Sequence, residues 1–383
     1  MSDNVFGVLR HNLERAKKSR PYSIVLKMTN TCNLDCTYCY VSHDNARFLK
    51  KEYVEKLFDE LMIYDYQSAC CVFHGGEPLI CYREINEIIS LLKRKEYGDR
   101  ISFDIQTNGT ILSDSIIQMI KTNNISVGIS LDGPKHIHDI YRKYKDGRGS
   151  FDVVMNNLNK LTHEKIRCGF LSVVCDETLA QLIETVKWFS NIGITYIDIK
   201  PYFQSDDRVT LSVEKYAQKM LELLNWLKEN PNRIYVREFD TFANAICGNK
   251  KKMSMCDKRN CWAGRDHITM DCNGDIYLCD RLLGYQMYVL GNIEKEHLDE
   301  ILSNPLISQF NSRKFEDVGE CNVCEVKHIC NMGCAATNLL ENNNDFCCFS
   351  KTAALCEYYK VIIGTMRQMY AQDVDALKIF ISG

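Results

Sequence analysis

The sequence predicts an α/β fold, a partial (β/α)6 TIM-like barrel followed by a cysteine-rich extension. Six short β-rich runs alternate with amphipathic stretches between residues 22 and 200. Consecutive βα units of this kind form a parallel sheet with helices on its outside. Six units are fewer than the eight of a closed barrel, so we expect the barrel to be open. After about residue 247, closely spaced cysteines replace this alternation.

The alternating runs define the expected elements in chain order. Strands are expected at 22–28, 69–74, 101–105, 125–130, 166–174 and 194–199. Helices are expected near 51–64, 83–95, 113–122, 150–163, 176–190, 212–229, 294–303 and 352–370. Residues 267–280 predict a hairpin, because Asn273-Gly274 is a typical two-residue turn. We therefore expect an N-terminal helical segment (1–21), a partial barrel (22–210), a helical bridge (211–250) and a cysteine-rich domain (251–383).

The composition excludes several classes of protein. The 47 Lys and Arg against 50 Asp and Glu give a formal net charge of −3, so no basic field attracts nucleic acid. No run approaches the ~18 apolar residues of a membrane span, and the N-terminal residues lack the apolar core of a signal peptide. We therefore expect a cytoplasmic protein with neither a nucleic-acid nor a membrane partner. In that reducing compartment, the 20 cysteines favour metal ligands over disulfides.

Three cysteines, Cys32, Cys36 and Cys39, follow the first expected strand with C-x3-C-x2-C spacing. They lie at the carboxyl end of that strand, and barrel active sites are built on this rim. Three thiolates in one loop suit a [4Fe–4S] cluster with one open iron, since a full set of ligands is four. The alternative is a zinc knuckle, which needs a fourth ligand, and His43 is the nearby candidate.

This triplet, with an aromatic residue before its last cysteine, resembles the motif of the radical S-adenosylmethionine (radical SAM) superfamily. The segments GGEP after the second strand and ISLDGP after the fourth resemble it too. The resemblance implies that S-adenosylmethionine is bound by Tyr38, Gly75, Gly76, Glu77, Pro78, Ser130, Arg142 and Phe203. The GGEP segment would take the methionine amino group, while Ser130 and Arg142 would contact the carboxylate and ribose. Tyr38 and Phe203 would pack at the adenine.

The resemblance also implies a reaction. The open iron binds the methionine amine and carboxylate, and one electron from reduced flavodoxin or ferredoxin cleaves the S–C5′ bond. The resulting 5′-deoxyadenosyl radical abstracts a hydrogen atom from the substrate, while the protein orients the cofactors and excludes water. A non-catalytic iron–sulfur protein is the alternative, but such a protein does not need a rim of GGEP, Ser130 and Arg142.

The C-terminal cysteines resemble the SPASM extension of peptide-modifying radical SAM enzymes. Cys261, Gly274 and Cys279 precede a C-x2-C-x5-C-x3-C run and a more distant cysteine. The resemblance implies two auxiliary [4Fe–4S] clusters, hence three clusters in all. The first would take Cys256, Cys261, Cys279 and Cys334, and the second Cys321, Cys324, Cys330 and Cys356. The alternatives are Cys247 or Cys272 for Cys256, Cys347 or Cys348 for Cys356, and zinc ribbons for the clusters.

The expected substrate is a ribosomally made peptide that acquires thioether or carbon–carbon crosslinks. His74 before GGEP resembles maturases of such peptides, whereas sulfatase maturases tend to carry Gln there. The alternative is an anaerobic sulfatase maturase, which makes formylglycine from Cys or Ser. In that family the residue matching Asp280 is the catalytic base, and a carboxylate is suited to proton transfer. Otherwise Asp280 caps the hairpin or pairs with Arg281, and His74 hydrogen-bonds within the barrel core.

Overall fold

The computed structural model describes residues 22–39, 41, 46–63, 66, 68–202, 211–249 and 261–382, so the helical segment expected at 1–21 lies outside it. Its fold is α/β, with parallel strands consistent with a partial TIM barrel, as the sequence predicts. The chain forms two compact units. Unit 1 comprises Met1–Ile129, Tyr144–Cys168 and Trp262–Phe310, and unit 2 comprises Ser130–Lys143, Gly169–Cys261 and Asn311–Gly383.

Unit 1 is built on a sheet with the strand order β10-β9-β8-β1-β2-β3-β4. Its strands are β1 (Tyr22–Lys27), β2 (Ala69–His74), β3 (Ile101–Thr107), β4 (Ser126–Ser130), β8 (His267–Met270), β9 (Asp275–Tyr277) and β10 (Val289–Asn292). β8 and β1–β4 are parallel, whereas β9 is antiparallel to both of its neighbours. The predicted hairpin is therefore present, and β8 joins it to β1 in a register that pairs Ser23 with His267.

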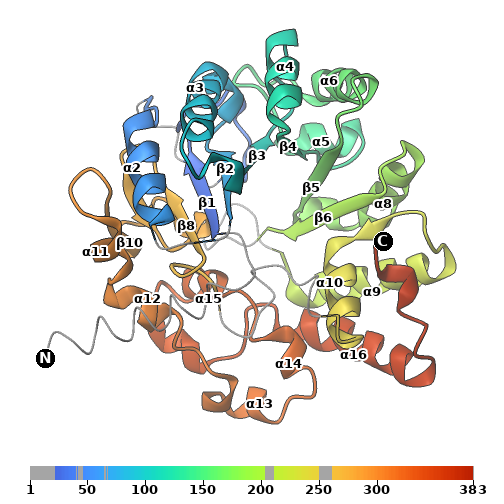
Figure 1. Ribbon diagram of the computed structural model, residues 1–383. Coiled ribbons are helices and arrows are strands. Elements are labelled where there is room, and N and C mark those ends of the chain that lie inside the picture. The colour runs from blue at the N-terminus through green and yellow to red at the C-terminus, as the bar shows by residue number, and fades with distance from the viewer. Residues whose placement is uncertain are drawn as a thin grey trace, which may run out of the picture. The chain divides into compact units, whose positions relative to one another are not determined.

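Amphipathic helices cover this sheet with their apolar faces. They are α2 (Lys51–Met62), α3 (Tyr82–Lys93), α4 (Asp114–Asn123), α6 (Phe151–His163), α11 (Leu298–Leu302) and α12 (Pro305–Phe310). The buried face of α3 consists of Ile85, Ile88, Ile89 and Leu92. This i, i+3, i+4, i+7 spacing is typical of a helix that lies against a core. Figure 1 shows α2, α3 and α4 on the outer side of β1–β3.

Unit 2 contains the parallel strands β5 (Cys168–Val174), β6 (Tyr196–Pro201) and β7 (Tyr235–Val236). Its first helices are α5 (Lys135–Tyr141), α7 (Asp176–Leu179), α8 (Leu182–Asn191), α9 (Val213–Glu229) and α10 (Arg237–Ile246). The C-terminal part has α13 (Gly319–Asn322), α14 (Lys327–Cys330), α15 (Ala335–Glu341) and α16 (Cys356–Gln372). α9 packs on α16, where the rings of Tyr216 and Tyr358 lie 5.0 Å apart. Within the described ranges, every helix is too short or too polar to cross a bilayer.

Candidate functional site

The cysteine loop after β1 is held by hydrogen bonds to its first sulfur. Cys32 is buried, and its Sγ accepts from the Leu34 amide at 3.4 Å and from Nδ2 of Asn108 at 3.7 Å. Burial raises the pKa of Cys32 to about 11, and these two donors oppose the rise because they stabilise the thiolate. Cys36 and Cys39 are partly exposed, and the Cys39 amide donates to the Cys36 carbonyl at 2.9 Å. This turn carries two of the thiols, and the third, that of Cys32, lies four residues before it.

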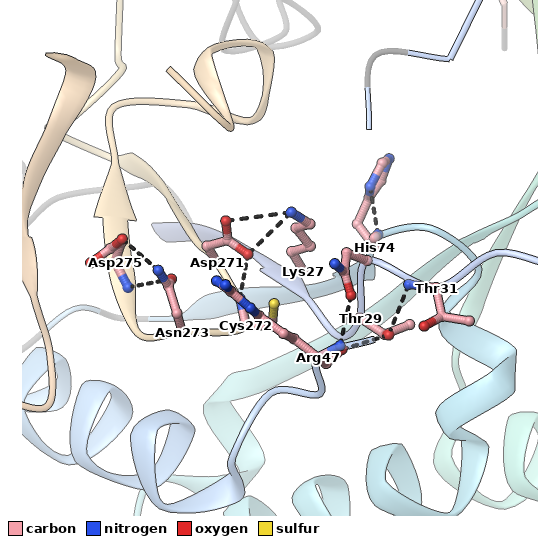
Figure 2. Close-up of polar contacts among 11 residues, drawn as sticks. Lys27, Thr29, Thr31, Arg47, His74, Asp271, Cys272, Asn273 and Asp275 are labelled. Atoms are coloured by element: carbon pink, nitrogen blue, oxygen red, sulfur yellow. Dashed lines mark hydrogen bonds and ion pairs between the residues drawn. The ribbon is translucent and has the colours of Figure 1, made fainter. Parts of the chain in front are cut away.

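Residues 29–31, which lead into this loop, are hydrogen-bonded to Arg47, which follows it (Figure 2). The Thr29 hydroxyl donates to the Arg47 carbonyl at 2.6 Å and accepts from the Thr31 amide at 3.0 Å. Oδ1 of Asn30 accepts from the Arg47 amide at 2.7 Å. These bonds hold the two ends of the cysteine loop together at the carboxyl end of β1.

Two glycines let the segment after β2 pack directly on the cysteine loop. The Gly76 amide donates to the Thr29 carbonyl at 2.8 Å, and the Glu77 amide donates to the Thr31 carbonyl at 3.0 Å. Gly75 has a φ of +140°, and a Cβ there would lie 2.5 Å from the Thr29 carbonyl oxygen. A Cβ on Gly76 would overlap the Thr31 carbonyl. Glycine is required at both positions, because backbone approaches backbone.

The Glu77 carboxylate joins the ends of β2 and β3. It is fully buried, and its Oε1 accepts from the Leu79 amide at 3.0 Å and the Thr107 hydroxyl at 2.7 Å. Its Oε2 accepts from the Asn108 amide at 2.7 Å. Burial raises the pKa of Glu77 to about 7, although these donors favour the charged form. A carboxylate has about four acceptor sites, and three of those on Glu77 are occupied. Pro78 follows as the first residue of a short 3₁₀ helix.

Asn108 is a site residue that the sequence analysis missed. Its Nδ2 contacts Cys32 and also donates to Oδ1 of Asn33 at 2.9 Å. Its Oδ1 accepts from the Thr110 hydroxyl at 2.6 Å, and the residue is buried directly after β3. A signal was available in the sequence, because Thr107-Asn108-Gly109 follows an expected strand at the rim where barrels place their sites.

Two residues expected to contact S-adenosylmethionine lie in unit 2. Ser130 is the last residue of β4, and Arg142 directly follows α5. Arg142 is buried, and it donates from Nε to Oδ2 of Asp132 at 2.8 Å and from Nη2 to Oδ1 at 3.3 Å. This ion pair fixes the Arg142 side chain, since a buried charge needs such a partner. Tyr38 is buried in unit 1, whereas Phe203 lies outside the described residues.

Asp280 follows the hairpin and pairs with a histidine. Its Oδ1 lies 3.5 Å from Nε2 of His267, the first residue of β8. Burial opposes ionisation, but the hydrogen bond to His267 and the charges of His267 and His74 lower the pKa of Asp280 to about 2. The burial is partial, because 46% of the Asp280 side chain is exposed. Asp280 is therefore a carboxylate at neutral pH, held from one side by His267.

His74, at the end of β2, uses one of its ring nitrogens as a hydrogen-bond acceptor. Its Nδ1 accepts from the Gly75 amide at 2.8 Å, so the neutral ring carries its proton on Nε2. Burial lowers the pKa of His74; the Asp280 charge opposes this, and the Lys27 charge adds to it. Lys27 is itself paired with Asp271 at 3.2 Å (Figure 2). His74 is therefore a neutral hydrogen-bond donor at neutral pH.

Four C-terminal cysteines surround a pocket within unit 2. It is lined by Cys321, Cys324, Cys330 and Cys356, together with lysine and apolar side chains. Cys347 and Cys348, the alternatives to Cys356, are not among its lining residues. Burial raises the pKa of Cys330 to about 12, and the charges of Cys356 and Cys321 add to the rise. Four thiolates at this pocket therefore require a positive partner, and the donor set fits a four-ligand iron–sulfur cluster.

Two family models match the chain. Residues 26–189 match the radical SAM superfamily, and residues 261–325 match SPASM, an iron–sulfur cluster-binding domain. The chain belongs to the radical SAM superfamily. It is a radical SAM/SPASM enzyme, a class that uses S-adenosylmethionine and [4Fe–4S] clusters.

Relatives of this radical SAM/SPASM enzyme include sulfatase-maturating enzymes. It is 28% identical to the serine-type anaerobic sulfatase-maturating enzyme of Bacteroides thetaiotaomicron, over 82% of this chain and 82% of the relative. It is 27% identical to the cysteine-type enzyme of Clostridium novyi, over 81% of this chain and 87% of the relative. The solved structure of native anSMEcpe with bound AdoMet and Kp18Cys peptide shares the fold, with a TM-score of 0.81 and 22% identity over 94% of this chain and 99% of that one.

The other cysteine set expected in this radical SAM/SPASM enzyme is divided between the units. Cys279 follows β9 in unit 1, whereas Cys261 and Cys334 belong to unit 2. The Sγ of Cys334 accepts from the Thr337 amide at 3.5 Å and so caps α15. Cys256 lies outside the described residues.

Proposed function

We propose that this enzyme is a sulfatase maturase that oxidises a Cys or Ser side chain of its protein substrate to formylglycine. Its relatives named for sulfatase maturation span 82% and 81% of the chain, which supports this class. The observation that carries the proposal is the carboxylate of Asp280, which directly follows Cys279 and pairs with His267. The bound peptide in the solved structure that shares this fold supports a peptide or protein substrate. Peptide crosslinking, the reaction first expected from the sequence, stays a prediction.

The radical site is proposed at the loop after β1. Cys32, Cys36 and Cys39 would hold a [4Fe–4S] cluster, and the Leu34 amide and the Asn108 side chain already donate to the first sulfur. The S-adenosylmethionine contacts would come from the GGEP segment, Tyr38, Ser130, Arg142 and Phe203. When bound, these groups would supply a 5′-deoxyadenosyl radical able to take one hydrogen atom from the substrate, and a cluster held by the auxiliary cysteines would provide an acceptor for one electron.

Asp280 is proposed as the base. After losing one hydrogen atom and one electron, a substrate –CH2OH or –CH2SH group must lose one proton to become a C=O or C=S group. The Asp280 carboxylate is ionised at neutral pH and partly exposed, so it has oxygen lone pairs free for that proton. Its lowered pKa makes it a weak base, which suits the acidic proton of an oxidised substrate. His267 keeps the carboxylate in place at 3.5 Å. For a Cys substrate, water then replaces the sulfur and releases hydrogen sulfide.

Two auxiliary clusters complete the proposal. Cys321, Cys324, Cys330 and Cys356 would bind one, and their common pocket supports this set over one that contains Cys347 or Cys348. Cys256, Cys261, Cys279 and Cys334 would bind the other. Reduced flavodoxin or ferredoxin is the proposed electron donor, and the proposed compartment is the cytoplasm.

A crosslinking peptide maturase is the second candidate, and His74 favours it. In place of an amide side chain, this position carries a neutral imidazole whose Nε2–H is a single donor. The imidazole lacks the second donor and the carbonyl acceptor of Gln, so the two side chains cannot hold a substrate backbone in the same way.

The deciding experiment uses the reconstituted enzyme, S-adenosylmethionine, and either dithionite or reduced flavodoxin under anaerobic conditions. Two peptides are compared, one that contains a sulfatase motif with a central Cys or Ser, and one rich in Cys and aromatic residues. An aldehyde that is captured by a hydrazide reagent supports the sulfatase maturase. Linked residues found by tandem mass spectrometry in the second peptide, without aldehyde in the first, would establish crosslinking instead. Formation of 5′-deoxyadenosine with neither product would reject both substrates.

A further inference from the structure

A buried arginine, Arg313, hydrogen-bonds to the loop that connects the two auxiliary cysteine sets. Its Nη2 donates to the Met332 carbonyl at 2.5 Å, and its Nη1 donates to the Gly333 carbonyl at 3.3 Å. That loop runs from Cys330, in the second set, to Cys334, in the first. One side chain therefore holds the short connection between a ligand of each proposed cluster.

The loop has an unusual backbone conformation, in which two of its carbonyl groups accept hydrogen bonds from Arg313. Asn331, Met332 and Gly333 have consecutive left-handed φ values of 50°, 61° and 63°. Left-handed backbone is unfavourable for a residue with a side chain such as Met, so it persists only where other contacts impose it. The amides of Met332 and Gly333 donate to Cys330, while the carbonyls of the same residues accept from Arg313. The thiol and the guanidinium thus hold the loop between them.

The charge of Arg313 is placed among thiols of both sets. Its Nη1 donates to the carbonyl of Gly333, the residue before Cys334, and its Nη2 donates to the carbonyl of Met332, two residues after Cys330. Burial lowers the pKa of Arg313, and the charges of Cys334, Cys348, Cys261 and Cys330 raise it. A guanidinium remains protonated in proteins under such conditions. Cys334 and Cys261 belong to the first proposed set, and Cys330 belongs to the second. A single fixed cation therefore acts on both.

One donor of this guanidinium lacks a partner among the described residues. Nε of Arg313 is buried and makes no hydrogen bond, although a buried donor of this kind is costly to leave unpaired. The Phe349 ring covers the guanidinium, with 5.3 Å from Cζ to the ring centroid, and thereby shields it from water. An anionic cluster held by the neighbouring thiolates would neutralise the charge and offer sulfur acceptors to Nε.

We propose that Arg313 is the shared cation of the two auxiliary clusters, raising the reduction potential of both and positioning the Asn331–Gly333 loop between them. The inference rests on the proposed function, because it requires both clusters. A reduced cluster carries one more negative charge than an oxidised one, so a nearby cation stabilises the reduced form. At an effective dielectric of about 20, a charge within roughly 10 Å changes the reduced-to-oxidised ratio on the order of tenfold. A tenfold change corresponds to about 59 mV for a one-electron couple.

The test measures potentials rather than turnover. In a background in which Cys32, Cys36 and Cys39 are replaced by Ala, the auxiliary clusters are titrated under electron paramagnetic resonance. Arg313→Gln removes the charge, and both cluster signals are expected to need a lower potential for half-reduction. Arg313→Lys keeps a charge and is expected to move both by less than half as much. Arg233→Gln removes an exposed arginine of unit 2 that follows α9 and should move neither.

Iron content separates this inference from the proposed function. A wild-type protein that holds only about four iron atoms lacks the auxiliary clusters, and the proposed function then fails. With about twelve iron atoms in both the wild type and Arg313→Gln, unchanged potentials would overturn the role of Arg313 alone. A shift in only one cluster would overturn the shared role.

A second measurement covers the case in which Arg313→Gln loses its iron. Protein labelled with ¹⁵N-arginine is reduced, and the nitrogen hyperfine coupling to the auxiliary clusters is recorded. We expect an arginine coupling in the wild type that disappears in Arg313→Lys, which retains its clusters. No arginine coupling, or a coupling that persists in Arg313→Lys, would overturn the proposal.

Discussion

Nδ2 of Asn108 lies 3.7 Å from Sγ of Cys32 and donates at 2.9 Å to Oδ1 of Asn33. One buried amide thus connects the end of β3 to the first cysteine of the proposed radical cluster. The Asn108 backbone amide also binds Glu77 at 2.7 Å, so the same residue joins the cysteine loop to the GGEP segment.

Replacing Asn108 by Ala should lower the reduction potential of the radical cluster. Hydrogen bonds to cluster sulfurs raise that potential, and Asn108→Ala removes one of them. We expect slower 5′-deoxyadenosine formation with dithionite and a lower potential in a redox titration. The matched control is Asn123→Ala, because Asn123 ends α4 and bonds there to the Met119 carbonyl and to the Lys93 side chain. Equal potentials for Asn108→Ala and the wild type would show that the contact has no electronic role.

Gly76→Ala should disrupt the site without touching a ligand. The new Cβ would overlap the Thr31 carbonyl, which must shift and carry Cys32 with it. We expect reduced iron at the radical site and a loss of 5′-deoxyadenosine formation. Gly364→Ala is the control, since a Cβ there meets open space within α16 and should add about 0.5–1 kcal/mol of stability. Wild-type cleavage of S-adenosylmethionine by Gly76→Ala would contradict the close packing.

Asp280→Asn separates the base from a structural role. Asn is isosteric, so all clusters and 5′-deoxyadenosine formation should be retained. Product should fall on the order of 10²–10⁴-fold, the usual contribution of a general base. Asp299→Asn, an exposed acid at the start of α11, is the control. Iron content, 5′-deoxyadenosine and modified peptide are measured on one sample, and full product per intact enzyme would reject Asp280 as the base.

His138 should make stability depend on pH. It is fully buried beside Asp132, whose amide it accepts at Nδ1, and burial lowers its pKa from 6.5 to about 4. In that window the unfolded chain binds a proton that the folded chain does not, so stability is present above pH 6.5 and lost as pH falls toward 4. The loss is roughly 3 kcal/mol at most.

His138→Asn tests this dependence, because the Asn carbonyl replaces Nδ1 as acceptor and does not titrate. Urea midpoints are compared at about pH 7 and about pH 5 for both proteins, and cluster loss in acid affects both alike. The wild type should lose more stability than the variant between these values. Parallel losses would assign the pH dependence to other groups.

The barrel strands were predictable because their apolar runs are short and bounded by turn residues. β2 occupies the predicted residues, and β1 ends one residue earlier than predicted. The helix expected at 176–190 is two helices, α7 and α8, because an apolar period that continues across Ala180 and Gln181 does not reveal a two-residue turn. No helix was expected between residues 317 and 352, where the structure contains α13, α14 and α15, because these helices are too short to establish a period.

The site was predictable only where its residues are close together in the sequence. The Cys32 loop and GGEP are contiguous motifs, so their residue types and spacing can be recognised directly. Other contacts depend on how separate segments pack and have no characteristic spacing in the sequence. Examples are the Asp132–Arg142 ion pair and the hydrogen bond from Arg313 to the Met332 carbonyl. The contact of His267 with Asp280 was equally unpredictable, since it arises from the path of the chain after β9.

The pairing of β1 with both β2 and β8 has a consequence for synthesis on the ribosome. β1 is the first strand to emerge, yet β8 is made only after the whole of β2–β7. Until then one side of β1 is an unpaired edge, which is a template for pairing with other chains. Sequence separation of this kind also slows folding. A fragment that ends at residue 210 would keep this edge permanently, so we expect it to aggregate, and unit 1 closes only once Met270 has left the ribosome.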